Sequence, residues 1–402
     1  MVTIPWPACL QLFGLVPSVH ILLLSRAAAL VDWLRGRGAF VSEAIECSAE
    51  ASRGIGLRAR RTVAQFEVLA KIPLRLCIYE ALPPSCDGPT GAETRWNLIE
   101  KLMHVKQQKG RAHYHPYIVT LPNKLNRLPL YWDSDAMESI QGTSLEIMCS
   151  TENRLLHRLF TDFYKVRYSK SEYELFRWAT GIVKSRVKVM ADYAALVPLL
   201  DLVNHEDLYD STWGSRGCVI VLDEDRQSST SELCYHLVAL TDIQSDEEIV
   251  VDYSLLSFQN KIAEYGIIDT RSNVLEKYYT LALENFSDRG NPMLINVRRT
   301  NLSNAFFELI SDGLNETYVR RSLQERESTL EKICASPDPC TIECRFIRET
   351  DLFYTKHCLQ NLSKIFSREG LFECQTTEEY ENSQKMEFMT RFYQHTGLKI
   401  EI

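Results

Sequence analysis

Short runs of alternating apolar and polar residues occupy the first part of the chain, a pattern typical of β-strands joined by tight turns. Residues 56–59 and 67–72 are predicted as strands, and a helix over 27–34 precedes them, stopped by Gly36 and Gly38. From about residue 96 to 190 the apolar spacing becomes helical. Further strands are predicted over 219–222 and 235–240. Beyond Gly266 the pattern is helical to the end, with amphipathic stretches over 274–283, 302–309 and 352–365.

One apolar run, residues 195–203, leads without a polar break through Asp201 into Asn204 and His205. Burying a carboxylate, an amide and an imidazole costs several kcal/mol, on the order of 2–7 for each neutral polar group, unless partners satisfy them. This cluster therefore indicates either a ligand site or a satisfied core histidine beside a turn asparagine.

A β-branched strand at 248–251 places a lone Tyr253 at its end, and Gly54 and Gly56 open an earlier strand. Composition alone favours a packed strand tyrosine and an ordinary turn. The glycines do not form the dinucleotide-binding fingerprint, because no third glycine follows and the loop opens a strand.

Arg186 lies on the apolar stripe of the helix that ends near residue 190, in line with Leu175, Ala179, Ile182 and Met190. Two interpretations stay open. Its guanidinium extends to solvent at the helix end, or it meets a buried anion.

Composition excludes several classes of function. The chain has 402 residues, 45% of them hydrophobic and 24% charged, which is typical of a soluble globular protein with more than one substructure. A net charge of −8 argues against a general nucleic-acid clamp. Twelve cysteines show no regular spacing, and the Cys334, Cys340, Cys344 cluster lacks the ligand spacing of a zinc site, so no metal is expected. The predicted compartment is therefore reducing.

The N-terminus has an apolar stretch, residues 8–24, interrupted by Gln11, Pro17 and His20. It lacks a basic segment before it, so a packing helix is favoured over a membrane anchor, and no stable membrane insertion is expected. The expected location is cytoplasmic or nuclear, with organelle targeting left open.

The motifs occur in an order that resembles the SET-domain protein methyltransferases, in the branch of the Rubisco large-subunit methyltransferase (Rubisco LSMT-like). The quoted residues are Arg53-Gly54-Ile55-Gly56-Leu57, Leu121-Pro122, Pro129-Leu130-Tyr131-Trp132, Gln141-Gly142-Thr143, Phe176-Arg177-Trp178-Ala179, Ser185-Arg186, Pro198 to His205, and Asp242-Ile243 with Glu247-Glu248 before Tyr253. Residues 28–270 carry the resemblance with good motif density. Asp246 stands where a glycine is common in the family, and Asp tolerates left-handed turn geometry.

The resemblance implies an α+β fold, a SET fold of small β-sheets with a pseudoknot, interrupted by a helical insert and followed by an all-α C-terminal domain. The implied divisions are a N-terminal extension (1–26), a first SET segment (27–90), a helical insert (91–190), a second SET segment with the catalytic tyrosine (191–270) and a helical substrate-binding domain (271–402).

The implied function is an S-adenosylmethionine (SAM)-dependent protein-lysine N-methyltransferase acting on a non-histone protein. Tyr253 is the expected catalytic residue. The expected cofactor-binding residues are Arg53, Gly54, Gly56, Glu67, Leu69, Arg186, Asp201, Asn204, His205 and Tyr265. Two alternatives stay open, a protein-histidine N-methyltransferase and an inactive SET-fold protein-binding module. The expected partner is a protein that presents a Lys side chain; no nucleic acid is expected, and the sequence leaves the oligomeric state open.

Overall fold

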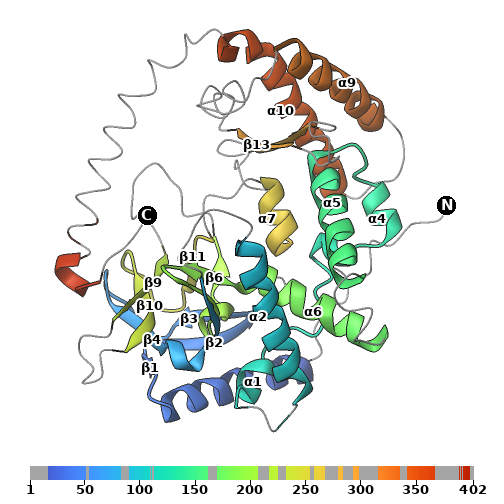
Figure 1. The fold of residues 1–402 in the computed structure, drawn as a ribbon. Coiled ribbons are helices and arrows are strands. Elements are labelled where there is room, and N and C mark those ends of the chain that lie inside the picture. Colours follow the sequence, from blue (N-terminus) through green and yellow to red (C-terminus); the bar gives the residue numbers. More distant parts are fainter. Residues whose placement is uncertain are drawn as a thin grey trace. The chain divides into compact units, whose positions relative to one another are not determined.

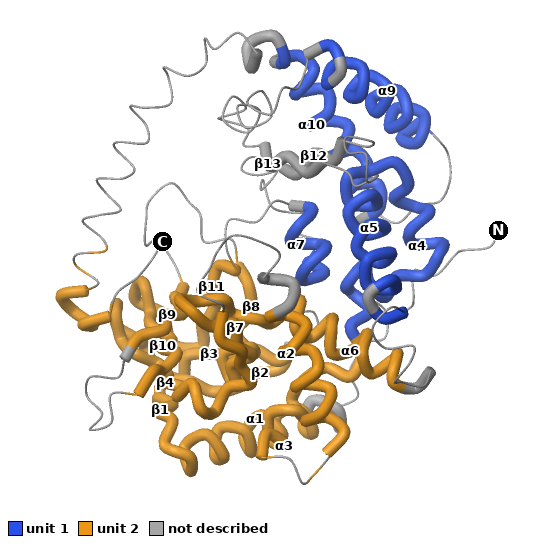
Figure 2. Tube along the Cα trace, in the orientation of Figure 1, with its two compact units in different colours: residues 1–7, 125–170, 255–380 blue, residues 8–124, 171–254, 381–402 orange. Residues whose placement is uncertain are grey.

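The computed structural model describes residues 17–50, 54–82, 90–108, 110, 113–161, 170–206, 217–224, 232–253, 258–267, 279–283, 293–297, 316–335, 342–366, 389, 391 and 393–398 (Figure 1). Two compact units divide the chain. Unit 1 comprises residues 1–7, 125–170 and 255–380, and unit 2 comprises residues 8–124, 171–254 and 381–402 (Figure 2).

Unit 2 contains an eight-stranded sheet in the order β1-β4-β10-β9-β11-β3-β2, with β8 also pairing with β11. The strands are β1 (Phe40–Val41), β2 (Ile45–Glu50), β3 (Gly54–Ala59), β4 (Val68–Pro73), β8 (Asn204–His205), β9 (Cys218–Glu224), β10 (Leu233–Ala239) and β11 (Glu248–Val251). The predicted strands near 56–59, 67–72, 219–222 and 235–240 are confirmed. Apolar residues such as Leu57, Leu69 and Leu237 are fully buried in this sheet.

A three-stranded sheet completes the β-structure of unit 2, in the order β5 (Ile78–Ala81), β7 (Tyr193–Leu196) and β6 (Lys188–Met190). The described helices of unit 2 are α1 (Pro17–Gly36), α2 (Thr90–Gln107), α3 (His115–Ile118) and α6 (Lys170–Arg186), whose first residue belongs to unit 1. Gly38, with a φ of +88°, follows the end of α1, as its predicted stop required.

Met190 does not extend the helical stripe that contains Arg186. Helix α6 ends at Arg186, and Met190 pairs with Tyr193 in the β6–β7 hairpin. The prediction of helix as far as residue 190 was wrong, because Lys188–Met190, with β-branched Val189 at its centre, finds a strand partner in β7.

Unit 1 is built mainly from helices: α4 (Ser134–Glu138), α5 (Ser144–Leu159), α7 (Phe258–Tyr265), α9 (Glu316–Ala335) and α10 (Ile342–Phe366). Its core contains Ile140, Leu145, Cys149, Ile262, Ala263, Cys344 and Ile347. The predicted helix over 352–365 is confirmed, whereas 302–309 lies outside the described residues.

Unit 1 also contains a hairpin of β12 (Tyr279–Leu283) and β13 (Met293–Val297), which the expectation of an all-α region did not include. The amphipathic stretch over 274–283 was predicted as a helix, but its described part is strand β12. Tyr279, Leu281 and Leu283 alternate along it, and a five-residue run of this kind does not distinguish strand from helix until its partner is known.

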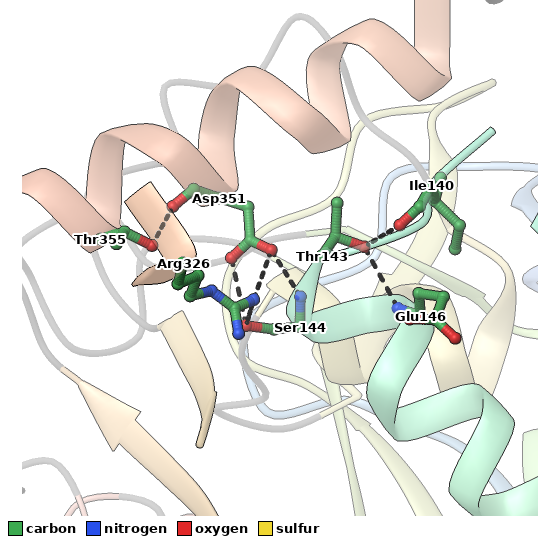
Figure 3. A network of polar contacts seen from close by, with 7 residues as sticks. All are labelled: Ile140, Thr143, Ser144, Glu146, Arg326, Asp351 and Thr355. Carbon is green, nitrogen blue, oxygen red and sulfur yellow. Dashed lines mark hydrogen bonds and ion pairs between the residues drawn. The ribbon is translucent and has the colours of Figure 1, made fainter. Parts of the chain in front are cut away.

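The Gln141-Gly142-Thr143 motif forms the start of α5. Thr143 is its N-cap and accepts a hydrogen bond from the Glu146 amide at 3.2 Å. Gly142 has a φ of +79°, and an added Cβ would lie 3.2 Å from Ile333 and 3.3 Å from Thr329. Beside this cap, Ser144 bonds Asp351 of α10, which pairs with Arg326 of α9 (Figure 3).

No helix in the described part of the chain is long and apolar enough to cross a membrane.

Candidate active site

Strand β11 brings together three segments that are far apart in the sequence. It pairs antiparallel with β3, where Ile249 lies opposite Leu57, and parallel with β8, where Val250 lies opposite Asn204. Its C-terminal end leads directly to Tyr253. The glycine loop, the Asn-His pair and the tyrosine thus converge at one end of the sheet of unit 2.

Gly56 has no side chain because two polar side chains fill that space. The Asn204 amide donates to the Glu248 carboxylate at 2.7 Å. A Cβ added at Gly56 would lie 2.8 Å from the Asn204 Nδ2 and 3.0 Å from the Glu248 Oε1, closer than real contacts allow. The immediate reason for this glycine is therefore packing against the Asn204–Glu248 pair.

Gly54 is different, because its surroundings are open. Its φ of +84° lies in the left-handed region, and no atom of the described residues lies within 4 Å of an added Cβ. A ligand can therefore approach the backbone closely at the start of β3. Arg53, the neighbouring candidate, lies outside the described residues.

Tyr253 is held at two points. Its hydroxyl donates to the main-chain carbonyl of Val203 at 2.7 Å, and its amide N–H donates to Nδ1 of His205 at 3.1 Å. The centroids of the Tyr253 and His205 rings lie 5.1 Å apart. The Asp252 carboxylate lies 3.8 Å from the same Nδ1.

Asp201 is a buried carboxylate between two donors. It accepts hydrogen bonds from the hydroxyl of Tyr117 in α3 and from the amide of Val197, the latter at 3.4 Å. Burial raises the pKa of Asp201 to about 6, while the Arg186 guanidinium and the Lys188 ammonium favour its charged form. Leu199, two residues earlier, has a φ of +70°, an uncommon conformation for a leucine. The sequence reasoning missed Tyr117, since nothing near it marks a carboxylate partner.

Arg186 is directed toward the buried segment and not only toward solvent. One Nη of its guanidinium donates to the main-chain carbonyl of Asp201. Its Nε is buried and has no hydrogen-bond partner among the described residues. A buried N–H donor without a partner costs about 1–3 kcal/mol, so the position suits an anionic group such as the carboxylate of the expected cofactor.

Lys188 is a second residue that sequence reasoning missed. It begins β6, and its Nζ lies 4.7 Å from the centroid of the Tyr253 ring. Burial lowers the pKa of Lys188, the Asp201 carboxylate opposes this change, and the Arg186 guanidinium adds to it. In the sequence, nothing distinguishes this lysine from those on the surface.

Glu67 and Leu69 are not brought to the end of β11. Strands β10 and β9 lie between β4 and β11 in the sheet order. Glu67 is paired with Arg61 at 2.7 Å, which lowers the pKa of its carboxyl group, and Leu69 is fully buried. Tyr265 ends α7 in unit 1. Cofactor contacts by these three residues stay a prediction.

No group of three His, Cys, Asp or Glu side chains that could hold a metal ion occurs in the part of the chain that the structure describes. Cys334 and Cys344 are free thiols there, and Cys340 lies outside it.

Comparisons with known proteins agree with the resemblance to protein methyltransferases. No protein-family model matches the chain. It is 25% identical over 271 residues to the chloroplastic fructose-bisphosphate aldolase-lysine N-methyltransferase of Arabidopsis thaliana, covering 63% of this chain and 53% of that protein. It is 22% identical over 275 residues to the Rubisco large subunit N-methyltransferase of Pisum sativum, with the same coverage. The actin-histidine N-methyltransferase of Drosophila melanogaster is 25% identical over 217 residues, 45% of this chain and 40% of that one. The chain thus spans about half the length of these relatives.

Solved structures give the fold. The crystal structure of the SET domain of LSMT bound to lysine and AdoHcy matches with a TM-score of 0.60 and 16% identity, covering 87% of this chain and 93% of that chain. Rubisco LSMT bound to AdoMet matches with a TM-score of 0.57, 17% identity and the same coverage. The chain has the fold of the Rubisco LSMT SET-domain structures, and over part of its length it is similar in sequence to the named methyltransferases.

Proposed function

We propose that this chain is a SAM-dependent protein-lysine N-methyltransferase that acts on a non-histone protein. The observation that carries the proposal is the placement of Tyr253. Its hydroxyl donates a hydrogen bond to the Val203 carbonyl. The next residue, Asn204, begins β8, and its side-chain amide donates to the Glu248 carboxylate. Relatives that are named lysine N-methyltransferases support the reaction type.

The residues present fit the cofactor. The open backbone at Gly54, the unsatisfied Nε of Arg186 and the β8 backbone at Asn204-His205 would hold it. When bound, the cofactor supplies a methyl group already activated by a sulfonium. The protein then contributes alignment and electrostatics.

The acceptor lysine must lose its proton before it can attack. With an ordinary pKa near 10.4, its neutral form at pH 7 lies ~4.6 kcal/mol uphill. The Arg186 guanidinium, which lowers the pKa of the neighbouring Lys188, would favour the neutral amine by repulsion. The phenol oxygen of Tyr253 accepts an N–H bond from that amine, which orients the nitrogen lone pair, while the Val203 carbonyl fixes the phenol.

The test has two stages. Calorimetry measures SAM binding to the folded chain and to Arg186→Met, for which weaker binding is expected. Transfer of labelled methyl groups into cell-extract proteins is then compared for wild type, Tyr253→Phe and Tyr79→Phe. Loss of transfer in the Tyr253 variant alone supports the proposal, because Tyr79 is exposed and lies on a different sheet. A folded chain that binds no SAM would instead be an interaction module.

Protein-histidine methylation is the second candidate. The relative named actin-histidine N-methyltransferase has the same 25% identity as the aldolase-lysine enzyme, but over 45% of this chain instead of 63%. A neutral imidazole also needs no deprotonation beside Lys188 at pH 7. Hydrolysis of the labelled product to free amino acids separates methyllysine from methylhistidine.

The proposal includes a location in the cytoplasm or nucleus and a set of domain boundaries. The described cysteines are free thiols, which fits the reducing cytoplasm or nucleus, while two of the relatives are named chloroplastic. The divisions at residues 27, 91, 191 and 271 are proposed on the order of the sequence motifs.

A further inference from the structure

Lys188 lies beside Tyr253, the expected catalytic residue. It is the second residue after the end of α6, and its backbone is paired with Ala195 in the β6–β7 hairpin. This pairing fixes the origin of the side chain. From there its Nζ reaches the face of the Tyr253 ring, 4.7 Å from the centroid.

The Tyr253 ring beneath it cannot move away without losing the hydrogen bond from its hydroxyl to the Val203 carbonyl. The mobile partner is therefore the lysine, whose four-carbon chain has several rotatable bonds. Rotation about its last bonds moves Nζ along the ring toward the phenol oxygen. The ammonium makes a cation–π contact with the ring, worth about 0.5–2 kcal/mol, and the Asp201 carboxylate attracts it as well.

Burial lowers the pKa of Lys188 from the ordinary value of a lysine. The Arg186 guanidinium also lowers this pKa, against the effect of the Asp201 carboxylate. A neutral amine is the nucleophile that methyl transfer requires, so this lysine is better prepared than an exposed one.

We propose that Lys188 is a self-methylation site, at which the chain transfers a methyl group from SAM to its own Nζ. The inference rests on the proposed function. The lone pair of the neutral Nζ forms the new N–C bond, the C–S bond breaks with its electron pair left on sulfur, and S-adenosylhomocysteine leaves. The nitrogen becomes a methylammonium, which loses its excess proton to solvent.

Lys106 provides a matched control. Its Nζ lies 4.4 Å from the Trp178 ring, and burial lowers its pKa too, but the aromatic ring that it contacts is not Tyr253. If aromatic contact and a lowered pKa were sufficient, both lysines would react. If the position beside Tyr253 decides, only Lys188 reacts.

The experiment incubates the purified, folded full chain with labelled SAM and no other protein, then maps methylated peptides by mass spectrometry. Methylation at Lys188 is expected, with a rate constant unchanged over a dilution series, since the transfer is intramolecular. Lys188→Arg should abolish at least nine-tenths of the incorporation, roughly a tenfold loss or about 1.4 kcal/mol. Lys106→Arg should leave it unchanged, and Tyr253→Phe should remove it without removing SAM binding.

A second measurement does not use the cofactor. Reductive alkylation with formaldehyde and borohydride, followed over a pH series, should modify Lys188 at lower pH than the exposed Lys101. If Lys188 and Lys101 were modified over the same pH range, the inference would be overturned. A chain that binds SAM and labels extract proteins but stays unmodified at Lys188 would overturn it while leaving the proposed function intact. A folded chain that binds no SAM would overturn both.

Discussion

The hydroxyl of Tyr117 donates a hydrogen bond to the carboxylate of Asp201, a residue 84 positions later in the chain. Both side chains are buried, and Arg186 bonds the main-chain carbonyl of the same aspartate. Helix α3 and the end of α6 are therefore both tied to the short segment that precedes Asn204 and His205. A substitution of Tyr117 or Asp201 should therefore lower the stability of the fold, and it should affect the candidate site by displacing this segment.

Tyr117→Phe is expected to destabilise the chain by about 1.5–3 kcal/mol above pH 7. The phenol is the donor to a buried carboxylate, and hydrogen bonds to charged groups contribute this much. Tyr114→Phe is the control, because its half-buried hydroxyl donates to the neutral carbonyl of Cys77 at 3.2 Å. Its loss should be smaller, about 0.5–1.5 kcal/mol. Urea unfolding of both variants measures the difference, and equal losses would contradict the assignment.

Asp201→Asn should change the pH dependence of stability. Burial raises the pKa of Asp201 from 3.8 to about 6, so the folded state binds this proton more tightly than the unfolded state. The resulting stabilisation is fully present below about pH 4 and is lost as the pH rises through about 6. Relative to wild type, the Asn variant should therefore gain about 2–3 kcal/mol between pH 4 and pH 7. Unfolding free energies over that range measure this gain, and parallel profiles would show that Asp201 does not titrate there.

Gly56→Ala should destabilise the chain by about 1–3 kcal/mol, because the new Cβ would meet Asn204 at 2.8 Å and Glu248 at 3.0 Å. Displacing Asn204 should also weaken SAM binding. Gly36→Ala is the control, since nothing lies within 4 Å of its added Cβ at the end of α1. Thermal unfolding and calorimetry measure both effects. If the Gly56 variant were as stable as wild type, the Asn204 and Glu248 side chains would be able to move aside at little cost in free energy.

Local patterns in the sequence predicted those parts of the fold that depend on neighbouring residues. The stop of α1 at Gly36 and Gly38 and the left-handed conformation of Asp246, with a φ of +67°, follow from the conformational preferences of single residues. The convergence of Gly56, Asn204 and Tyr253 was inferred only through family resemblance.

The missed features all depend on tertiary partners. Tyr117 acquires its role from Asp201, and Lys188 acquires its lowered pKa from burial and from Arg186. Strand β12 is defined by pairing with β13, since its apolar residues alone also suit a helix. Glu67 was expected at the cofactor from the family resemblance alone. Its contact with Arg61 was not predicted, because it depends on the turn that brings the two side chains together.

The Arg326–Asp351 pair in unit 1 offers a test that is independent of catalysis (Figure 3). The two side chains are 8% and 2% exposed and lie 2.7 Å apart, and Ser144 at the start of α5 donates to the same carboxylate. Asp351→Ala would leave the guanidinium buried without its counter-ion, so a loss of about 3–5 kcal/mol is expected.

Glu331→Ala is the matched control, because its partner Lys356 joins the same two helices, α9 and α10, at 2.6 Å but on the exposed surface. Exposed pairs contribute only about 0–1 kcal/mol, since water screens them. Urea unfolding of the full chain, followed by helical circular dichroism, measures both variants. If the two losses were similar, the buried pair would be replaceable, and the junction of α5, α9 and α10 would depend on its apolar contacts instead.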